Sequence, residues 1–348
     1  PSTAPSDGYK EAEIKNVIFL IGDGMGFNHL NKTEKERELS LTIDEFDIGG
    51  ESMTRSLSAA VTDSAAGGTA LATGERTSNG AIGVYMFDLF ATYSYPKNIT
   101  ELCRDNKMLT GVITTDETSG ATPSAFSAHA TERYKSEDIT EDQMKSNINL
   151  IWGTENGVAT KEMADEYGYE YVTTYNEMMA LEEGSKSFAQ FTNDLWTLNQ
   201  SDKNNPTLSQ MTEKAIDLLD DGENGFFLMV EGSNIDVYAH NGDMKSTVEQ
   251  MQAFDHTVDY VLNWAEQNPG TLVIVTADHE TGAIVLNDDG TYSFTSGSHS
   301  GVDVPLLVYG SDKLIRGDET INNYEVPIRI AYTLGFTEDE FPYEVKVA

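Results

Sequence analysis

The chain has 348 residues, of which 39% are hydrophobic, as expected of a globular protein that can bury a large core. It carries 22 Lys and Arg residues against 58 Asp and Glu residues, and the formal net charge of -36 argues against nucleic acid or an anionic membrane as a partner. A single cysteine, Cys103, excludes an internal disulfide and a cysteine cage for a metal, and no uninterrupted apolar stretch is long enough to span a bilayer.

The excess of negative charge predicts a response to salt. The acidic composition can serve solubility alone, and we favour the second interpretation, adaptation to a saline medium, because dissolved ions screen the repulsion between exposed carboxylates. Raising sodium chloride from low to molar concentration should therefore raise the melting temperature, which circular dichroism measures directly. A melting temperature that stays flat or falls over this range would contradict the interpretation.

The chain begins with a polar, proline-containing run over residues 1–14, which we expect to be a loose tail. This start has neither the charged region nor the apolar region of a signal peptide, and we expect that any such peptide has been removed. Residues 15–348 are expected to form a single domain.

Five short apolar runs predict strands, in the order Asn16–Ile21, Gly111–Thr114, Phe226–Val230, Thr271–Ala277 and Val304–Tyr309. Helical patterns lie between them. One helix is expected to begin after Thr207, which has capping-box spacing to Gln210, and another to run through Asp243–Gln267. The more polar residues 153–206 are predicted to form a helical insertion or cap. Strands that alternate with helices indicate a three-layer α/β/α sandwich around a mostly parallel central sheet.

Acidic and metal-binding residues directly follow three of these strands. Asp23 follows the first, Glu231 the third, and Asp278 and His279 the fourth. Ligands of open α/β sheets bind beyond the carboxyl ends of the strands, so these side chains are expected to meet at one edge.

Ser64 lies in the run VTDSAAGGTALATG, where a serine that enters an Ala- and Gly-rich helix is ordinarily an N-cap. The same position suits a nucleophile, because free backbone N–H groups and the positive helix end bind phosphate oxygens. No histidine adjoins Ser64 in the sequence, so metal coordination would have to activate it. In a chain poor in Lys and Arg, metal ions are also the obvious source of positive charge for an anionic substrate.

Further candidate metal ligands lie in the second half of the chain. Asp236 and His240 are four positions apart, so a helical turn places both on one face, and His299 lies in GSHSG. Mixed His and Asp ligands without cysteine suit catalytic zinc, and the set divides into two sites of three ligands each: Asp23, Asp236, His240, Asp278, His279 and His299. Two such ions can clamp the attacking and leaving oxygens of a displacement at phosphorus.

The chain resembles the alkaline phosphatases of the bacterial type over roughly residues 15–309. The matching motifs, in family order, are IGDGMG, VTDSAAGGTALATGERTSNGAIGV, GATPSAFSAHATER, FFLMVEGSNIDVYAH, TLVIVTADHETG and GSHSGVDVP. The combination of the DSA motif with ADHETG is highly specific. The resemblance implies an alkaline-phosphatase-like fold, the hydrolysis of phosphate monoesters to alcohol and inorganic phosphate, and a secreted or periplasmic location.

The resemblance also implies a role for each matching residue. Ser64 would be the nucleophile that forms a covalent phosphoserine, Arg133 would donate two hydrogen bonds to the phosphate, and Asp63 would orient Arg133. Each chain would bind two Zn²⁺ and one Mg²⁺. The zinc on the side of the leaving group would be bound by Asp236, His240 and His299. The zinc that lowers the pKa of the serine would be bound by Asp23, Asp278 and His279. The magnesium would be bound by Asp23, Thr122 and Glu231.

The chain departs from the family pattern at two places that bear on function. Position 120 is glycine, where the family commonly has Asp or His beside the third ion, so we expect no side chain there to hold the ion's water and a weaker magnesium site. The segment between His279 and His299 is short, which predicts a reduced crown insertion. The resemblance implies a homodimer, and the reduced crown leaves a monomer as the alternative.

Two rival functions remain compatible with the residues. A phosphodiesterase or a cofactor-independent phosphoglycerate mutase resembles this family in its core and metal ligands, although the surroundings of Arg133 favour a monoesterase. A catalytically inactive metal- or phosphate-binding protein is the rival from another class. The intact set of Ser64, Arg133 and six ligands argues against it.

Overall fold

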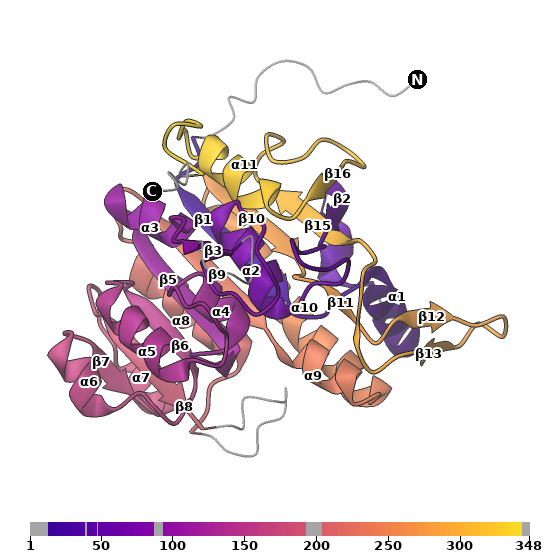
Figure 1. The fold of residues 1–348 in the computed structure, drawn as a ribbon, viewed down its shortest axis with the longest axis horizontal. Coiled ribbons are helices and arrows are strands. Elements are labelled where there is room, and N and C mark those ends of the chain that lie inside the picture. The colour runs from indigo at the N-terminus through magenta and orange to yellow at the C-terminus, as the bar shows by residue number, and fades with distance from the viewer. Residues whose placement is uncertain (1–12, 39, 47, 87–92, 193–203, 343–348) are drawn as a thin grey trace.

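A computed structural model describes residues 13–38, 40–46, 48–86, 93–192 and 204–342 (Figure 1). The predicted tail at residues 1–14 lies outside the described residues except for Glu13 and Ile14. No described helix is both long and apolar enough to cross a membrane.

Ten strands form one central sheet. From edge to edge they are β16 (Thr320–Asn322), β2 (Ile48–Met53), β15 (Val304–Tyr309), β10 (Thr271–Thr276), β1 (Asn16–Gly22), β9 (Phe226–Gly232), β5 (Leu109–Glu117), β6 (Leu150–Thr154), β8 (Ser187–Phe191) and β7 (Glu170–Val172). Strand β15 is antiparallel to both of its neighbours, whereas the other paired strands are parallel. The mostly parallel sheet predicted from the five apolar runs is confirmed.

Helices cover both faces of this sheet, because the side chains of each buried strand alternate between two cores. Ile18 and Leu20 of β1 belong to one core, and Val17, Phe19 and Ile21 belong to the other. The first core includes residues of α1 (Phe27–Arg37), α7 (Tyr175–Met179), α8 (Leu208–Leu219), α9 (Asn234–His240) and α10 (Met244–Gln267). The second includes residues of α2 (Ser64–Thr73), α3 (Ile99–Asp105), α4 (Ala121–Ala125), α5 (Ser136–Lys145), α6 (Lys161–Glu166) and α11 (Glu325–Thr333). The three-layer α/β/α sandwich is therefore confirmed.

The two predicted helices are also present. Helix α8 follows Thr207, whose side chain accepts a hydrogen bond from the Gln210 N–H while the Gln210 side chain accepts one from the Thr207 N–H. Helix α10 follows Asp243, which caps the Ser246 N–H. Cys103 is buried in α3, as expected of a small apolar residue.

The segment 153–206 differs from its prediction as a helical insertion. It contains the short helices α6 and α7, but also β7 and β8, which extend the central sheet beyond β6. All five residues of β8 are buried, and they pair in parallel with β6. A short apolar run does not distinguish a buried strand from a helix, and the pairing with β6 decides in favour of the strand. Residues 193–203 of this segment lie outside the described residues.

The segment between His279 and His299 forms a small antiparallel hairpin. Strands β12 (Ile284–Leu286) and β13 (Tyr292–Phe294) pair with each other and project from the body of the molecule (Figure 1). At their base, β11 (Glu280–Thr281) pairs with β14 (His299–Ser300). This pairing returns the chain to the sheet edge and places His299 close to His279. The remaining short elements are a 3-10 helix over Thr42–Glu45 and the pair β3 (Tyr85–Met86) and β4 (Tyr93–Ser94).

Candidate active site

Ser64 is the first residue of α2, at the edge where the parallel strands end. The N-cap of this helix is Asp63, whose Oδ1 accepts a hydrogen bond from the Ala66 N–H at 3.0 Å. Ser64 is therefore free of the capping role that a serine in this context ordinarily has. Its Oγ lies 3.1 Å from His279 Nε2. The helix can come this close because residue 67 is glycine: a Cβ there would lie 2.9 Å from the backbone oxygen of Asp278.

The second oxygen of Asp63 contacts Arg133, which lies in the segment after α4. Arg133 Nη1 donates to Asp63 Oδ2 at 3.1 Å, and the Gly80 N–H donates to the same oxygen at 3.0 Å. Asp63 thus holds the guanidinium on the side of the sheet edge where Ser64 lies. The predicted pairing of Asp63 with Arg133 is present as a hydrogen bond.

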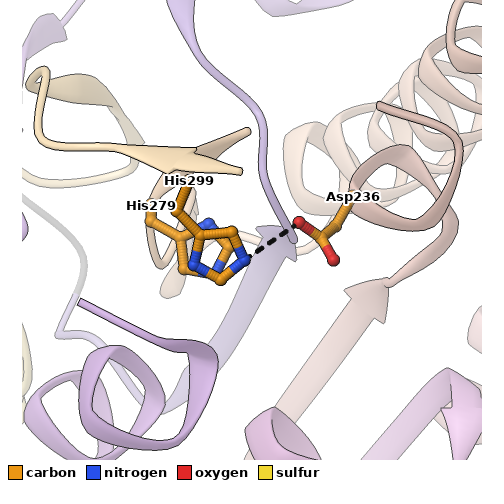
Figure 2. Close-up of side chains that lie close together, drawn as sticks. All are labelled: Asp236, His279 and His299. Atoms are coloured by element: carbon orange, nitrogen blue, oxygen red, sulfur yellow. Dashed lines mark ion pairs between the residues drawn. The ribbon is translucent and has the colours of Figure 1, made fainter. Parts of the chain in front are cut away.

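One group of potential metal ligands surrounds Asp236 of α9. One ligand atom from each of Asp236, His279 and His299 lies within 4.8 Å of the others. Figure 2 shows the Asp236 carboxylate pointing toward the two imidazoles, with its ion pair to His299 at 3.5 Å. The rings of His279 and His299 are stacked, with centroids 3.5 Å apart. His240 adjoins this group, because its Nε2 lies 3.3 Å from Asp236 Oδ1 and 3.0 Å from His299 Nε2.

A second group joins the ends of β1 and β10. It consists of Asp23, Asp278 and His279, whose ligand atoms also lie within 4.8 Å of one another. His279 Nε2 lies 3.2 Å from Asp278 Oδ2 and 3.6 Å from Asp23 Oδ1. The six residues predicted to bind zinc therefore meet in one place, and His279 connects the two groups.

Backbone carbonyl oxygens contact the Nδ1 atoms of two of these imidazoles. His299 Nδ1 lies 3.0 Å from the Thr62 carbonyl oxygen, and His240 Nδ1 lies 2.8 Å from the Gly297 carbonyl oxygen. A hydrogen bond to a carbonyl fixes the proton on Nδ1 and leaves Nε2 free to bind a metal ion. The imidazoles are thus oriented as ligands.

Thr281 is a residue that the analysis of the sequence missed. Its hydroxyl donates a short hydrogen bond to Asp236 Oδ1 and lies 3.3 Å from His279 Nδ1. Thr281 therefore contacts a residue of each group of potential metal ligands. Its position in ADHETG, two residues after His279, was the available signal, because a hydroxyl this close to candidate ligands in the chain can reach them.

The electrostatics of the second group suit a bound cation. Asp23 Oδ1 and Asp278 Oδ2 are buried and have no hydrogen-bond partner among the described residues. Burial and the charge of Asp278 raise the pKa of Asp23 well above its usual value, while burial lowers the pKa of His279. Buried carboxylates close together disfavour ionisation unless positive charge compensates them, and a neutral imidazole is the form that binds a metal. The residues present therefore fit metal ions.

The residues predicted for magnesium lie beside these groups. Glu231 at the end of β9 is fully buried, and its Oε2 accepts a short hydrogen bond from the Thr114 hydroxyl. Its Oε1 and the Thr122 Oγ1 of α4 have no partner with hydrogen-bond geometry among the described residues. Burial and then the charge of Asp116 raise the pKa of Glu231 well above its usual value. Asp116, two residues beyond Thr114 in β5, is a second residue that the analysis of the sequence missed.

The fold and this site define a class of protein: a three-layer α/β/α protein that gathers carboxylates and imidazoles around a serine at the carboxyl ends of its strands. The family model of the alkaline phosphatases matches residues 14–149 and 153–297. Alkaline phosphatase 4 of Bacillus subtilis is 33% identical over an alignment of 302 residues that covers 80% of this chain and 64% of that protein. The chain belongs to the alkaline phosphatase family.

Solved structures agree with this assignment. The cold-active alkaline phosphatase of a psychrophilic Shewanella has a TM-score of 0.82 at 26% identity, over 92% of this chain and 99% of that one. The alkaline phosphatase of the Antarctic bacterium TAB5 has a TM-score of 0.78 at 28% identity, over 94% of this chain and 100% of that one. A variant of the TAB5 enzyme has Mg bound in its M3 site. The chain spans 57% to 65% of the length of the first four curated relatives that it matches.

Proposed function

We propose that this protein is an alkaline phosphatase that hydrolyses phosphate monoesters through a covalent phosphoserine on Ser64. The observation that carries the proposal is the place of Ser64. Its hydroxyl lies at the start of α2 and 3.1 Å from the imidazole of His279, which belongs to both groups of potential metal ligands. A hydroxyl next to metal ligands at a helix N-terminus suits attack on a phosphate.

We propose that the site binds two Zn²⁺ and one Mg²⁺. One zinc would be held by Asp236, His240 and His299, and the other by Asp23, Asp278 and His279. The magnesium would be held by Asp23, Thr122 and Glu231. When bound, the ions would supply positive charge that lowers the pKa of the serine hydroxyl and stabilises the leaving-group oxygen.

The chain's own residues account for the covalent steps. Ser64 Oγ attacks the phosphorus, the bond from phosphorus to the ester oxygen breaks, and the alcohol leaves with the proton that the serine gives up. Water then attacks the phosphorus of phosphoserine 64, so that Ser64 recovers its proton and inorganic phosphate is released. Arg133, held by Asp63 at 3.1 Å, donates to the phosphate oxygens in both steps, and the N-terminal N–H groups of α2 face the same anion.

Replacing Arg133 with lysine tests this role for the guanidinium. Lysine keeps the positive charge but cannot donate two parallel hydrogen bonds, so kcat/KM for p-nitrophenyl phosphate should fall by about 10- to 100-fold, the equivalent of one lost charge-assisted hydrogen bond. The inhibition constant of inorganic phosphate should rise in parallel. Arg329→Lys is the matched control, because Arg329 pairs with Glu319 and Glu325 away from the site and should keep the parental values. Equal kinetics for Arg133→Lys and the parent would exclude the proposed phosphate contact.

The reaction class itself is tested by substrate comparison. A phosphomonoesterase should turn over p-nitrophenyl phosphate steadily and bis-p-nitrophenyl phosphate negligibly. Preference for the diester would identify a phosphodiesterase instead. Failure to turn over either ester, with metal ions bound, would identify a binding protein.

Location and assembly complete the proposal. We propose that the protein works outside the cytoplasm, secreted or periplasmic, as its resemblance to bacterial enzymes implies. The β12–β13 hairpin stands in place of a larger insertion, so the protein is either a homodimer, as in the resemblance, or a monomer. Light scattering measures the mass of the protein in solution and distinguishes the two.

A further inference from the structure

The space beside Gly120 is filled by a side chain from elsewhere in the chain. A Cβ built on Gly120 would overlap Asp116 Oδ2 and would lie 2.7 Å from Asp116 Cγ. Any residue larger than glycine at position 120 would therefore displace this carboxylate. The glycine at position 120 thus leaves room that the Asp116 carboxylate occupies.

The backbone of β5 explains how Asp116 reaches that space. The register between β5 and β6 shifts between Ile113 and Glu117, so the strand is irregular at this point. Such irregularities re-aim side chains at the ends of strands. The Thr114 hydroxyl then joins two parts of the site, because it accepts from the Asp116 N–H at 2.8 Å and donates to Glu231.

Three of the residues proposed to bind magnesium have buried oxygens without a partner in the described part of the chain. Glu231 Oε1 and Thr122 Oγ1 are buried without a hydrogen-bond partner among the described residues, and so is Asp23 Oδ1. Buried polar atoms in native proteins ordinarily have partners, so each of these orphaned oxygens calls for an ion or an ordered water. Asp116 is also the charged residue that acts most strongly on Glu231.

We propose that Asp116 supplies the carboxylate that faces the third cation of this site, directly or through a bound water. This carboxylate occupies the space that a side chain at position 120 would otherwise fill. The inference rests on the proposed function, since it completes the magnesium site with Asp23, Thr122 and Glu231. An all-oxygen site with a third carboxylate favours a hard, strongly hydrated cation such as Mg²⁺ over zinc. The glycine at position 120 and the aspartate at position 116 then form a compensating pair.

The test measures Mg²⁺ binding rather than turnover. Titration of Mg²⁺ into the zinc-loaded protein by isothermal calorimetry should show at least ~10-fold weaker binding for Asp116→Ala and for the nearly isosteric Asp116→Asn, since lost partners of a metal site cost about 10- to 100-fold. The double variant Asp116→Ala/Gly120→Asp should recover an affinity within about threefold of the parent, since it returns a carboxylate to the same space. Asp138→Ala is the control of equal charge change, because Asp138 is exposed on α5. The zinc content of every variant, measured by mass spectrometry, verifies that the site is folded.

Three outcomes would overturn the inference. Parental Mg²⁺ affinity in both single variants is the first. A fully zinc-loaded double variant that does not recover Mg²⁺ binding is the second. Weakened binding of inorganic phosphate, measured by calorimetry, with unchanged Mg²⁺ affinity is the third, and it would make Asp116 a partner of Arg133 instead. None of these measurements depends on catalysis, so they leave the proposed phosphatase reaction to be judged separately by Ser64→Ala.

Discussion

Ser64→Ala is expected to slow the hydrolysis of p-nitrophenyl phosphate by about 10³-fold or more, which is the scale on which loss of a nucleophile slows other hydrolases. The effect should be this large because alanine removes the attacking oxygen itself, which lies at the N-terminus of α2 and beside His279. The fold should survive, since the Ser64 hydroxyl contacts His279 Nε2 within the candidate site and alanine keeps the rest of the helix start unchanged. Steady-state kinetics and a melting curve of the same preparation measure both quantities.

The covalent step has its own readout. At low pH the phosphoenzyme is expected to accumulate when the protein is incubated with inorganic phosphate, and intact-mass spectrometry should find the adduct on the parent but not on Ser64→Ala. Ser146→Ala, at the end of α5, serves as the control and should keep both the adduct and the turnover. Phosphate labelling that survives the loss of Ser64 would place the intermediate on another residue.

Removing the metal ions is expected to abolish turnover and to lower the melting temperature. Asp23 and Glu231 are buried, and burial raises the pKa of both, with Asp278 and Asp116 as the strongest neighbouring charges. Without cations these carboxylates lose their compensation. Ions present at ~1,000 times their dissociation constant stabilise a fold by about 4 kcal/mol, which corresponds to roughly 5 °C for a chain of this size.

The measurement is a melting curve before and after treatment with a chelator, followed by the return of Zn²⁺ and Mg²⁺. Ser64→Ala separates binding from catalysis, because it should show the same shift in melting temperature while it lacks turnover. If the chelator changed neither quantity in the parent, the carboxylates and imidazoles of this site would not be metal ligands.

Much of the fold and of the site follows from local patterns in the sequence. The apolar runs that became β1, β9 and β10 end directly at Asp23, Glu231 and Asp278, and parallel strands bring such ends to one edge. The helix start at Thr207 follows from a capping side chain, and the helix over Asp243–Gln267 from the spacing of its apolar residues, both of which act within a few residues. These predictions held because the physical cause in each case is short in range.

Contacts between distant segments could be decided only by the tertiary structure. Strands β7 and β8 are short and became part of the sheet because β8 pairs with β6 and β7 pairs with β8, which a local pattern does not specify. His299 stacks on His279, with ring centroids 3.5 Å apart, because β11 pairs with β14, and a local pattern does not specify this pairing either.

Asp116 shows, within a single site, the same difference between what the sequence determines and what the tertiary structure decides. The sequence determined that position 120 has no side chain, and it also contained the aspartate four residues earlier. Whether that carboxylate turns toward Gly120 depends on the shifted register between β5 and β6 and on the Thr114 hydroxyl that joins Asp116 to Glu231. Both depend on which strands lie next to β5, and strand pairing is a property of the folded chain as a whole.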